Sequence, residues 1–370
     1  MIDVATARKT YRVAVVGGAG TWGRHYMRAY AEHPQCRIMG LVDRARKRRQ
    51  QFADHYGAEA VYDQIEDLLA KQVPDIVSVV LPVDVSLDVV VTCAQAGVKA
   101  VSCEKPVAVS LEQADEAIRI CRELGTSLGC AVSYWAMPYL IECAQWVQAG
   151  NIGRLTSAAI PAGLSHEVSG KCCVALVYLR LLTGMEVEWV EGWTLGPDPS
   201  WTFPSGASES EMDGPAYGRL GLSGGIVCDV PKPDSDAKHN GLVVLHGENG
   251  QVRLRSPRPV LMQGTGASSR RAQPAFFNKP WKDDRWAGAI GRLIDAVENG
   301  GEAICSAADF RQALEIAIAL KRSCARGHER VHLPLEDRSL RLFPCPHRLS
   351  GGDIVGWKAC GYEGPPALVG

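Results

Sequence analysis

Three glycines near the start of the chain have the spacing of a phosphate-binding turn. Gly18, Gly20 and Gly23 give the pattern G-x-G-x-x-G, between an apolar run at 12–16 and a helix-like segment at 22–32. Because glycine has no Cβ atom, Gly18 can make a tight turn, Gly20 can approach a pyrophosphate, and Gly23 can pack against the strand. The pattern therefore predicts a turn that binds a dinucleotide.

Two further features complete this predicted site. The first N–H groups of the helix, at Thr21 and Trp22, would face the phosphates. Asp43 ends another apolar run about 20 residues later, where a carboxylate can accept hydrogen bonds from ribose hydroxyls and would repel a 2′-phosphate. This favours NAD. Arg44 could hold a 2′-phosphate, so NADP stays open as the alternative.

A second group of charged residues follows the apolar run at 100–103. Glu104-Lys105-Pro106 would lie at the carboxyl end of a parallel strand, where open α/β sheets place their ligands. An ammonium group there can polarise a hydroxyl or carbonyl oxygen, and desolvation would let it join proton transfer. Glu104 is expected to hold either Lys105 or a cofactor hydroxyl. Pro106 fixes the turn that follows.

The elements that must position these residues alternate between strand and helix in the first third of the chain. Strand-like apolar runs lie at 12–16, 37–42, 76–80, 100–103 and 128–132. Helical segments lie at 22–32, 45–56, 64–71, 87–96 and 111–124. Short links between such elements predict an α/β fold with a doubly wound parallel sheet.

The pattern changes after about residue 133. A helix is expected at 134–149 and a helix pair at 286–299 and 307–325. Between them, β-like runs lie at 155–160, 187–193, 223–230, 241–246 and 251–255, with a hairpin signal at 247–250 and a loop-like stretch at 197–218. We therefore expect three parts: a dinucleotide-binding domain at 1–133, an α/β substrate domain with an open, mostly antiparallel sheet at 134–333, and an irregular tail at 334–370.

Composition narrows the class of protein. The chain has 370 residues with 46% hydrophobic and 22% charged side chains, which is ordinary for a globular protein of two domains. A formal net charge of −1 argues against nucleic acid or an anionic membrane as partner. No apolar run is long enough to span a bilayer, and the first residues lack a signal-peptide pattern. The 13 cysteines fit free thiols in a reducing cytosol, so we expect a cytoplasmic protein.

A metal site is not expected. Cys345-Pro-His347 and Cys360 are the nearest approach to one, but their spacing is poor, a fourth ligand is missing, and no Cys-x-x-Cys pair accompanies them. We expect these residues to belong to a tail that packs on the body of the protein.

The chain resembles the Gfo/Idh/MocA family of glucose–fructose oxidoreductases, inositol dehydrogenases and rhizopine-catabolism proteins. The resemblance spans roughly residues 11–326 and rests on 18–23, Asp43, Glu104-Lys105-Pro106, the turn at 150–153 and the helix pair. It implies a Rossmann domain that binds NAD or NADP, with Pro82 beside the cofactor and Lys105 near nicotinamide and substrate. It further implies a sugar, sugar derivative or cyclitol as substrate, and a homodimer or homotetramer formed through the open sheet.

The sequence departs from this family at the proton-transfer residue. The family usually carries a His and, three residues on, an Asp in a helix that here ends at Gly184; these positions hold Val174 and Val177. Neither valine can accept a proton. His166 and Lys171 lie just upstream, and Lys171 is about one helical turn before Val174, so its side chain could reach the same cleft.

Three functions are compatible with these observations. The first is an ordinary NAD-dependent oxidoreductase in which Lys105 acts together with Lys171 or His166. The second is a redox-neutral enzyme that recycles bound NAD during elimination or glycoside cleavage. The third is a regulator that binds NAD or NADP without turnover. The Glu-Lys-Pro sequence favours an enzyme, whereas a dinucleotide-binding fold by itself does not distinguish the three.

Overall fold

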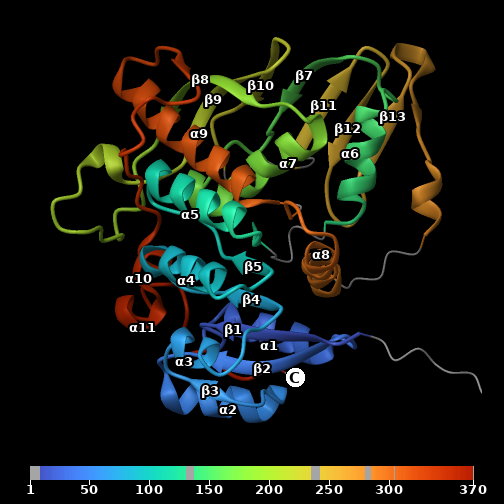
Figure 1. The fold of residues 1–370 in the computed structure, drawn as a ribbon. Coiled ribbons are helices and arrows are strands. Elements are labelled where there is room, and N and C mark those ends of the chain that lie inside the picture. The colour runs from blue at the N-terminus through green and yellow to red at the C-terminus, as the bar shows by residue number, and fades with distance from the viewer. Residues whose placement is uncertain (1–8, 131–136, 235–241, 280–284, 304, 370) are drawn as a thin grey trace, which may run out of the picture.

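Two β-sheets organise the protein (Figure 1). The computed structural model describes residues 9–130, 137–234, 242–279, 285–303 and 305–369. The strand end predicted at 131–132, the helix start predicted at 134–136 and the domain boundary predicted at 133 lie outside the described residues.

The first sheet has six parallel strands in the order β3-β2-β1-β4-β5-β6. Its strands are β1 (Tyr11–Val16), β2 (Cys36–Val42), β3 (Val61–Tyr62), β4 (Ile76–Val79), β5 (Ala100–Cys103) and β6 (Ser127–Gly129). Strands β4 and β5 are buried along their whole length, as expected for a sheet covered on both faces. The predicted doubly wound parallel sheet is confirmed.

Five helices connect the strands of this sheet: α1 (Gly23–Glu32), α2 (Arg46–Tyr56), α3 (Ile65–Leu69), α4 (Val83–Gln95) and α5 (Leu111–Glu123). Strand β1 pairs with both β2 and β4, so the strand order reverses beside β1. Open parallel sheets bind ligands outside the carboxyl ends of their strands at this reversal. The glycine turn follows β1, Asp43 follows β2 and Glu104 follows β5, so the topology brings the predicted residues to one edge of the sheet.

The second sheet has nine strands in the order β14-β13-β12-β11-β7-β10-β9-β8-β15. They are β7 (Leu155–Ala159), β8 (Val187–Thr194), β9 (Ala216–Leu222), β10 (Ile226–Val230), β11 (Val243–Gly247), β12 (Gly250–Leu254), β13 (Val260–Gln263), β14 (Arg270–Arg271) and β15 (Val331–His332). Among these strands only β7 and β10 pair in parallel. The predicted mostly antiparallel sheet and the hairpin between β11 and β12 are therefore confirmed.

Helices cover one face of the second sheet. Helices α7 (Cys173–Thr183) and α9 (Ala307–Ala325) contact its strands, and α6 (Leu140–Gln148) packs on α7. Leu220, Leu245 and Val252 are buried, whereas Trp193 and Arg219, at alternate positions along β8 and β9, are exposed. The sheet therefore keeps one open face.

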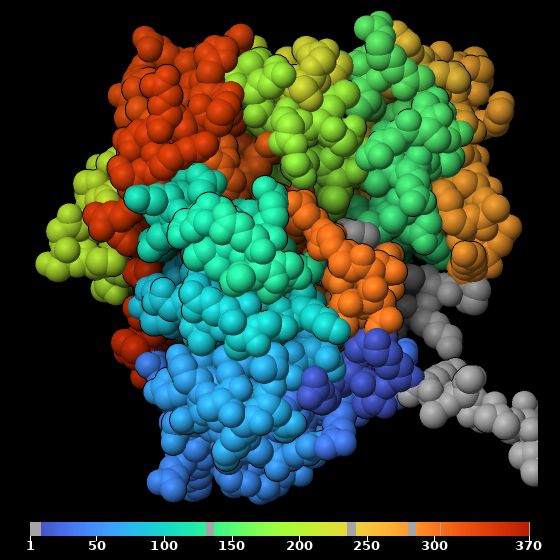
Figure 2. Space-filling view, viewed as in Figure 1, coloured from blue at the N-terminus to red at the C-terminus, as the bar shows by residue number. Residues whose placement is uncertain are grey.

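Segments after residue 285 contact the elements of the first sheet. Helix α8 (Arg285–Asn299) contacts α1, β4 and β5, and α9 contacts α5. The tail, expected as irregular, contains two short helices, α10 (Pro346–Ser350) and α11 (Gly352–Val355), and α10 contacts α4. Figure 2 shows dark red atoms of the tail beside the blue atoms of the first domain. The tail therefore packs on the domain that carries the predicted nucleotide site.

Candidate functional site

At two positions of the glycine turn, a side chain would collide with backbone atoms. Gly17 takes the left-handed φ of +77°, and a Cβ atom on it would lie 2.2 Å from the carbonyl oxygen of Val80. A Cβ atom on Gly23 would lie 2.0 Å from the carbonyl oxygen of Gly17. The prediction that Gly18 makes the tight turn is wrong, because Gly17 has the positive φ while Gly18 packs against Leu41.

Asp43 closes the turn from the end of β2. Its carboxylate accepts hydrogen bonds from the N–H groups of Ala19 (3.0 Å) and Ala45 (2.8 Å), and the residue is 9% exposed. Burial raises the pKa of Asp43, against the lowering effect of these two hydrogen bonds. A carboxylate offers about four lone-pair sites, so two remain for ribose hydroxyls. The residues present therefore fit an adenine dinucleotide at this position.

Two arginines stand at the same end of the sheet. Arg44 is exposed. Arg48 donates from Nε to the carbonyl oxygen of Ala19 at 2.8 Å, and its Nη2 lies 2.8 Å from Asp353 Oδ2 in the tail. Arg48 was not predicted, because the sequence shows it only as one of several basic residues at the start of α2. It fixes the glycine turn and ties the tail to it.

The charged residues after β5 occupy the other side of the site. Glu104 accepts a hydrogen bond of 2.7 Å from the hydroxyl of Tyr26, on α1. Lys105 is 7% exposed, and its ammonium lies 5.9 Å from the centre of the Trp22 ring. The peptide bond between Lys105 and Pro106 is cis. Glu104 is thus held by α1, and Lys105 is almost removed from bulk water.

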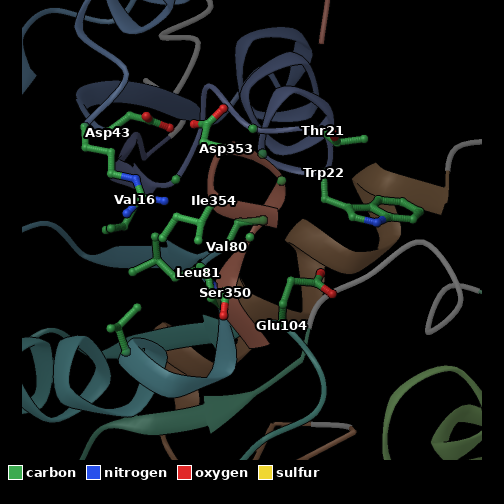
Figure 3. Close-up of a pocket in the computed structure, with 18 of the residues that line it drawn as sticks. Val16, Thr21, Trp22, Asp43, Val80, Leu81, Glu104, Ser350, Asp353 and Ile354 are labelled. Carbon is green, nitrogen blue, oxygen red and sulfur yellow. The ribbon is translucent and has the colours of Figure 1, made fainter. Parts of the chain in front are cut away.

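A cavity of about 490 Å³ joins these groups, within the range of about 300–1,000 Å³ that is usual for ligand pockets (Figure 3). The predicted residues that line it are Gly20, Thr21, Trp22, Gly23, Asp43, Arg44, Pro82, Glu104 and Lys105. Gly18 does not line the cavity; it packs against Leu41. The structure therefore brings the predicted cofactor residues and Lys105 to a single site.

His166 and Lys171 lie elsewhere. Both precede α7, and Lys171 Nζ lies 2.8 Å from His166 Nε2, at the surface. Burial and the charge of Lys171 lower the pKa of His166. Neither residue is among those that line the cavity. Their proposed role in proton transfer stays a prediction.

The helix that usually carries the family's histidine is apolar here. Val174 and Val177 are 8% and 0% exposed, and both belong to the hydrophobic core. A short π-helical turn, η1 (Val168–Cys172), precedes α7. The carboxylate of Asp213 accepts hydrogen bonds from the N–H groups of Val168 (3.0 Å) and Ser169 (2.8 Å), and this holds the loop before β9 against the turn. The start of α7 is thus a packed structural element.

The tail contributes one side of the cavity, which the sequence did not indicate. Figure 3 shows Asp353 between Asp43 and the Thr21–Trp22 turn. It shows Ile354 near Val16, at the end of β1, and near Val80 and Leu81, which follow β4. The tail residues that line the cavity are His347, Arg348, Ser350, Gly351, Gly352, Asp353, Ile354, Trp357, Cys360 and Tyr362. The nucleotide site is therefore built from both ends of the chain.

A buried ion pair anchors α10 beside the site. Arg348 Nε lies 2.6 Å from Glu167 Oε1, and the two side chains are 14% and 4% exposed. Burial alone would raise the pKa of Glu167, but the Arg348 guanidinium lowers this pKa below its ordinary value. Cys345 Sγ donates toward the same carboxylate oxygen at 3.5 Å. These contacts join α10 to the start of η1.

Two other features bear on the class of protein. Among the described residues, no group of three or more His, Cys, Asp or Glu side chains is placed to hold a metal ion. Within the same residues, no helix has the length and apolar character needed to cross a membrane.

Comparison with known proteins agrees with the geometry. Residues 11–132 match the family model described as "Oxidoreductase family, NAD-binding Rossmann fold". Over 328 residues the chain is 22% identical to "Uncharacterized oxidoreductase YrbE" of Bacillus subtilis (strain 168), covering 84% of this chain and 93% of that protein. Over 117 residues it is 30% identical to "D-glucoside 3-dehydrogenase" of Escherichia coli (strain K12), covering 32% of this chain and 33% of that protein.

A solved structure shares the fold over most of the chain. The structure of levoglucosan dehydrogenase in complex with NADH and levoglucosan superimposes with a TM-score of 0.73 at 16% identity, covering 88% of this chain and 100% of that one. Together with the family model, this match confirms the predicted resemblance. The family model for residues 11–132 is described as NAD-binding, which agrees with the predicted cofactor.

Proposed function

We propose that this chain, whose first domain belongs to the NAD-binding Rossmann domains of the Gfo/Idh/MocA oxidoreductases, oxidises or reduces a C–OH group of a sugar, sugar derivative or cyclitol. The observation that carries the proposal is the cavity in which the glycine turn, Asp43 and Lys105 meet. The substrate class is supported by relatives named as a glucoside and a levoglucosan dehydrogenase.

The residues of the cavity divide the work. Bound NAD would accept or supply the hydride at its nicotinamide ring. Asp43 and the first N–H groups of α1 hold the nucleotide by its ribose and phosphates. Lys105 polarises the substrate oxygen, because its ammonium is nearly desolvated and lies at the carboxyl end of β5. Glu104, fixed by Tyr26, orients the groups around it.

A matched pair of lysines tests this proposal. Lys105 follows the carboxyl end of β5, and the exposed Lys99 precedes its amino end. With a panel of sugars and cyclitols, Lys105→Met should lower kcat/KM by about 10²–10⁴-fold, while Lys99→Met should leave it unchanged. NADH affinity, measured by fluorescence, should stay near the wild-type value in both variants. NADH binding without turnover of any substrate would overturn the proposal and favour the regulatory alternative.

A second function is favoured by the tail. Because Asp353 and Ile354 cover the cavity and the tail is tied to Arg48, bound NAD would be slow to leave. Retained NAD suits a redox-neutral reaction in which the cofactor is reduced and reoxidised within one turnover. Such an enzyme should purify with NAD and form product without net NADH, and stripping the cofactor should abolish the reaction.

The open face of the second sheet is the proposed interface of a homodimer or homotetramer in the cytoplasm. Trp193, 40% exposed, stacks on Tyr217 with ring centres 5.2 Å apart, and aromatic side chains are enriched at protein interfaces. Trp193→Glu would place a charge in this interface, so it should shift the mass measured by light scattering towards a monomer. An unchanged mass would exclude this face.

A further inference from the structure

The cavity has a lysine for polarising oxygen, but α7 offers it no group that can accept a proton. Val174 and Val177 are buried among apolar residues, and His166 and Lys171 pair with each other outside the cavity lining. Among the described residues that line the cavity, His347 is the only histidine. It lies on α10, in the tail.

Three contacts anchor helix α10, which carries His347. Cys345, which precedes the helix, is 2% exposed, and its Sγ lies 3.4 Å from His347 Nδ1. Arg348 is anchored by its ion pair with Glu167. Leu349 packs in a small apolar cluster with Val83, Val109 and Phe343. A five-residue helix would not persist alone, so these contacts fix the ring in place.

The surroundings of His347 keep its imidazole neutral. Burial, followed by the charge of Arg348, lowers the pKa of His347 to about 4, while Glu167 opposes this and Lys105 adds to it. Lys105 and His347 also line the same cavity, which places an ammonium and a neutral imidazole at one site. A neutral imidazole has one nitrogen that can accept a proton.

We propose that His347 exchanges the proton of the substrate hydroxyl beside Lys105, as the tail's substitute for the histidine missing from α7. The inference rests on the proposed oxidoreductase function. In the oxidative direction the hydride leaves the substrate carbon for oxidised nicotinamide, and the hydroxyl O–H bond breaks. The proton passes to a ring nitrogen of His347, and the electron pair left on oxygen completes the C=O bond. Reduction reverses each change.

Two histidine variants test this role in the full chain. His347→Gln should lower kcat by about 10²–10⁴-fold with NADH affinity close to the wild-type value. His246→Gln, at an exposed position of β11, is the matched control and should keep the wild-type rate. An unchanged kcat in His347→Gln, or an equal loss in His246→Gln, would overturn the proposal. A wild-type chain that binds NADH but turns over no sugar would instead overturn the oxidoreductase function itself.

A chemical probe tests the position of His347 without turnover or substitution. Diethylpyrocarbonate modifies neutral imidazole, and peptide mass spectrometry follows each histidine. With NADH at about ten times its Kd, modification of His347 should be ~10-fold slower and that of His166 unchanged. If NADH leaves the rate at His347 unchanged, His347 does not border the bound cofactor and the proposal fails.

Discussion

Asp43 provides a test of nucleotide specificity at the scale of a single residue. Its carboxylate is placed by two backbone N–H groups, and Arg44 stands next to it. Asp43→Ala should lower NAD affinity by roughly 10–100-fold, since it removes charge-assisted hydrogen bonds worth about 1.5–3 kcal/mol. NADP should lose less, because the repulsion of its 2′-phosphate disappears and Arg44 remains.

Fluorescence titration with NADH and NADPH measures both affinities. Asp54→Ala, at an exposed position of α2, is the control and should alter neither. Equal losses of NADH and NADPH affinity in Asp43→Ala would show that Asp43 only supports the turn.

A second prediction at the scale of a single residue concerns His347 and the pH dependence of the free energy of unfolding. Burial lowers its pKa from 6.5 to about 4, so between these values the unfolded chain binds a proton that the folded chain does not. The free energy of unfolding should therefore fall as pH drops through this window, by an amount on the order of 3 kcal/mol at most. His347→Gln should remove this part of the pH dependence.

Denaturant unfolding at pH 7.5 and pH 5 checks the prediction. His246→Gln, on the exposed side of β11, serves as the control. A loss of stability on acidification that is the same in wild type and in His347→Gln would contradict it.

At the scale of elements, the junction of β1 and α1 depends on close backbone contact. A Cβ atom on Gly23 would lie within 2.0 Å of Gly17 O and 2.6 Å of Gly18 Cα, both of which are backbone atoms. Gly23→Ala should therefore cost about 2 kcal/mol or more and abolish NADH binding. Gly291→Ala, inside α8 with no atom within 4 Å, should instead stabilise the protein by about 0.5–1 kcal/mol. Wild-type NADH binding by Gly23→Ala would contradict this account of the turn.

The elements that could be predicted are those whose pattern is local. Strand β5 and helix α9 have the predicted bounds, because a continuous apolar run or a long capped periodic segment specifies each one. Strand β9 was missed, since Gly218 and Gly221 interrupt it and its start fell within a predicted loop. Strand β15 has two residues, too few for a pattern, and forms by pairing with β8.

The residues of the site also fall into those with a local sequence pattern and those without one. The glycine turn, Asp43 and Glu104–Lys105 were predictable, because each lies directly after a strand of a parallel sheet. The contacts of the tail could not be predicted from the sequence. Arg48 pairs with Asp353 across 305 residues, and Glu167 pairs with Arg348 across 181 residues. Helices α10 and α11 are too short to have a helical signature.

At the scale of the whole molecule, the two ends of the chain enclose the nucleotide site. The glycine turn comes from the first 25 residues, while Ile354 and Asp353 come from the tail. Ile354 is 65% exposed although it is apolar, and it borders the cavity. An apolar side chain in this position is suited to cover an adenine ring, so we expect the tail to slow the release of bound NAD.

Removal of the end of the tail tests this arrangement. A chain that stops after Ser350 keeps α10 and His347 but loses the Arg48–Asp353 pair and the hydrogen bond between Tyr56 and Val369. We expect these contacts to open before NADH can leave. Each contact contributes about 1 kcal/mol, so the truncated chain should release NADH ~10-fold faster or more. Stopped-flow displacement measures the rate, and Asp353→Asn should give an intermediate value. Because the cavity persists between the glycine turn and the tail, we expect the tail to cover the nucleotide rather than to occupy its place. Slower release or tighter binding after truncation would show instead that the tail competes for the site.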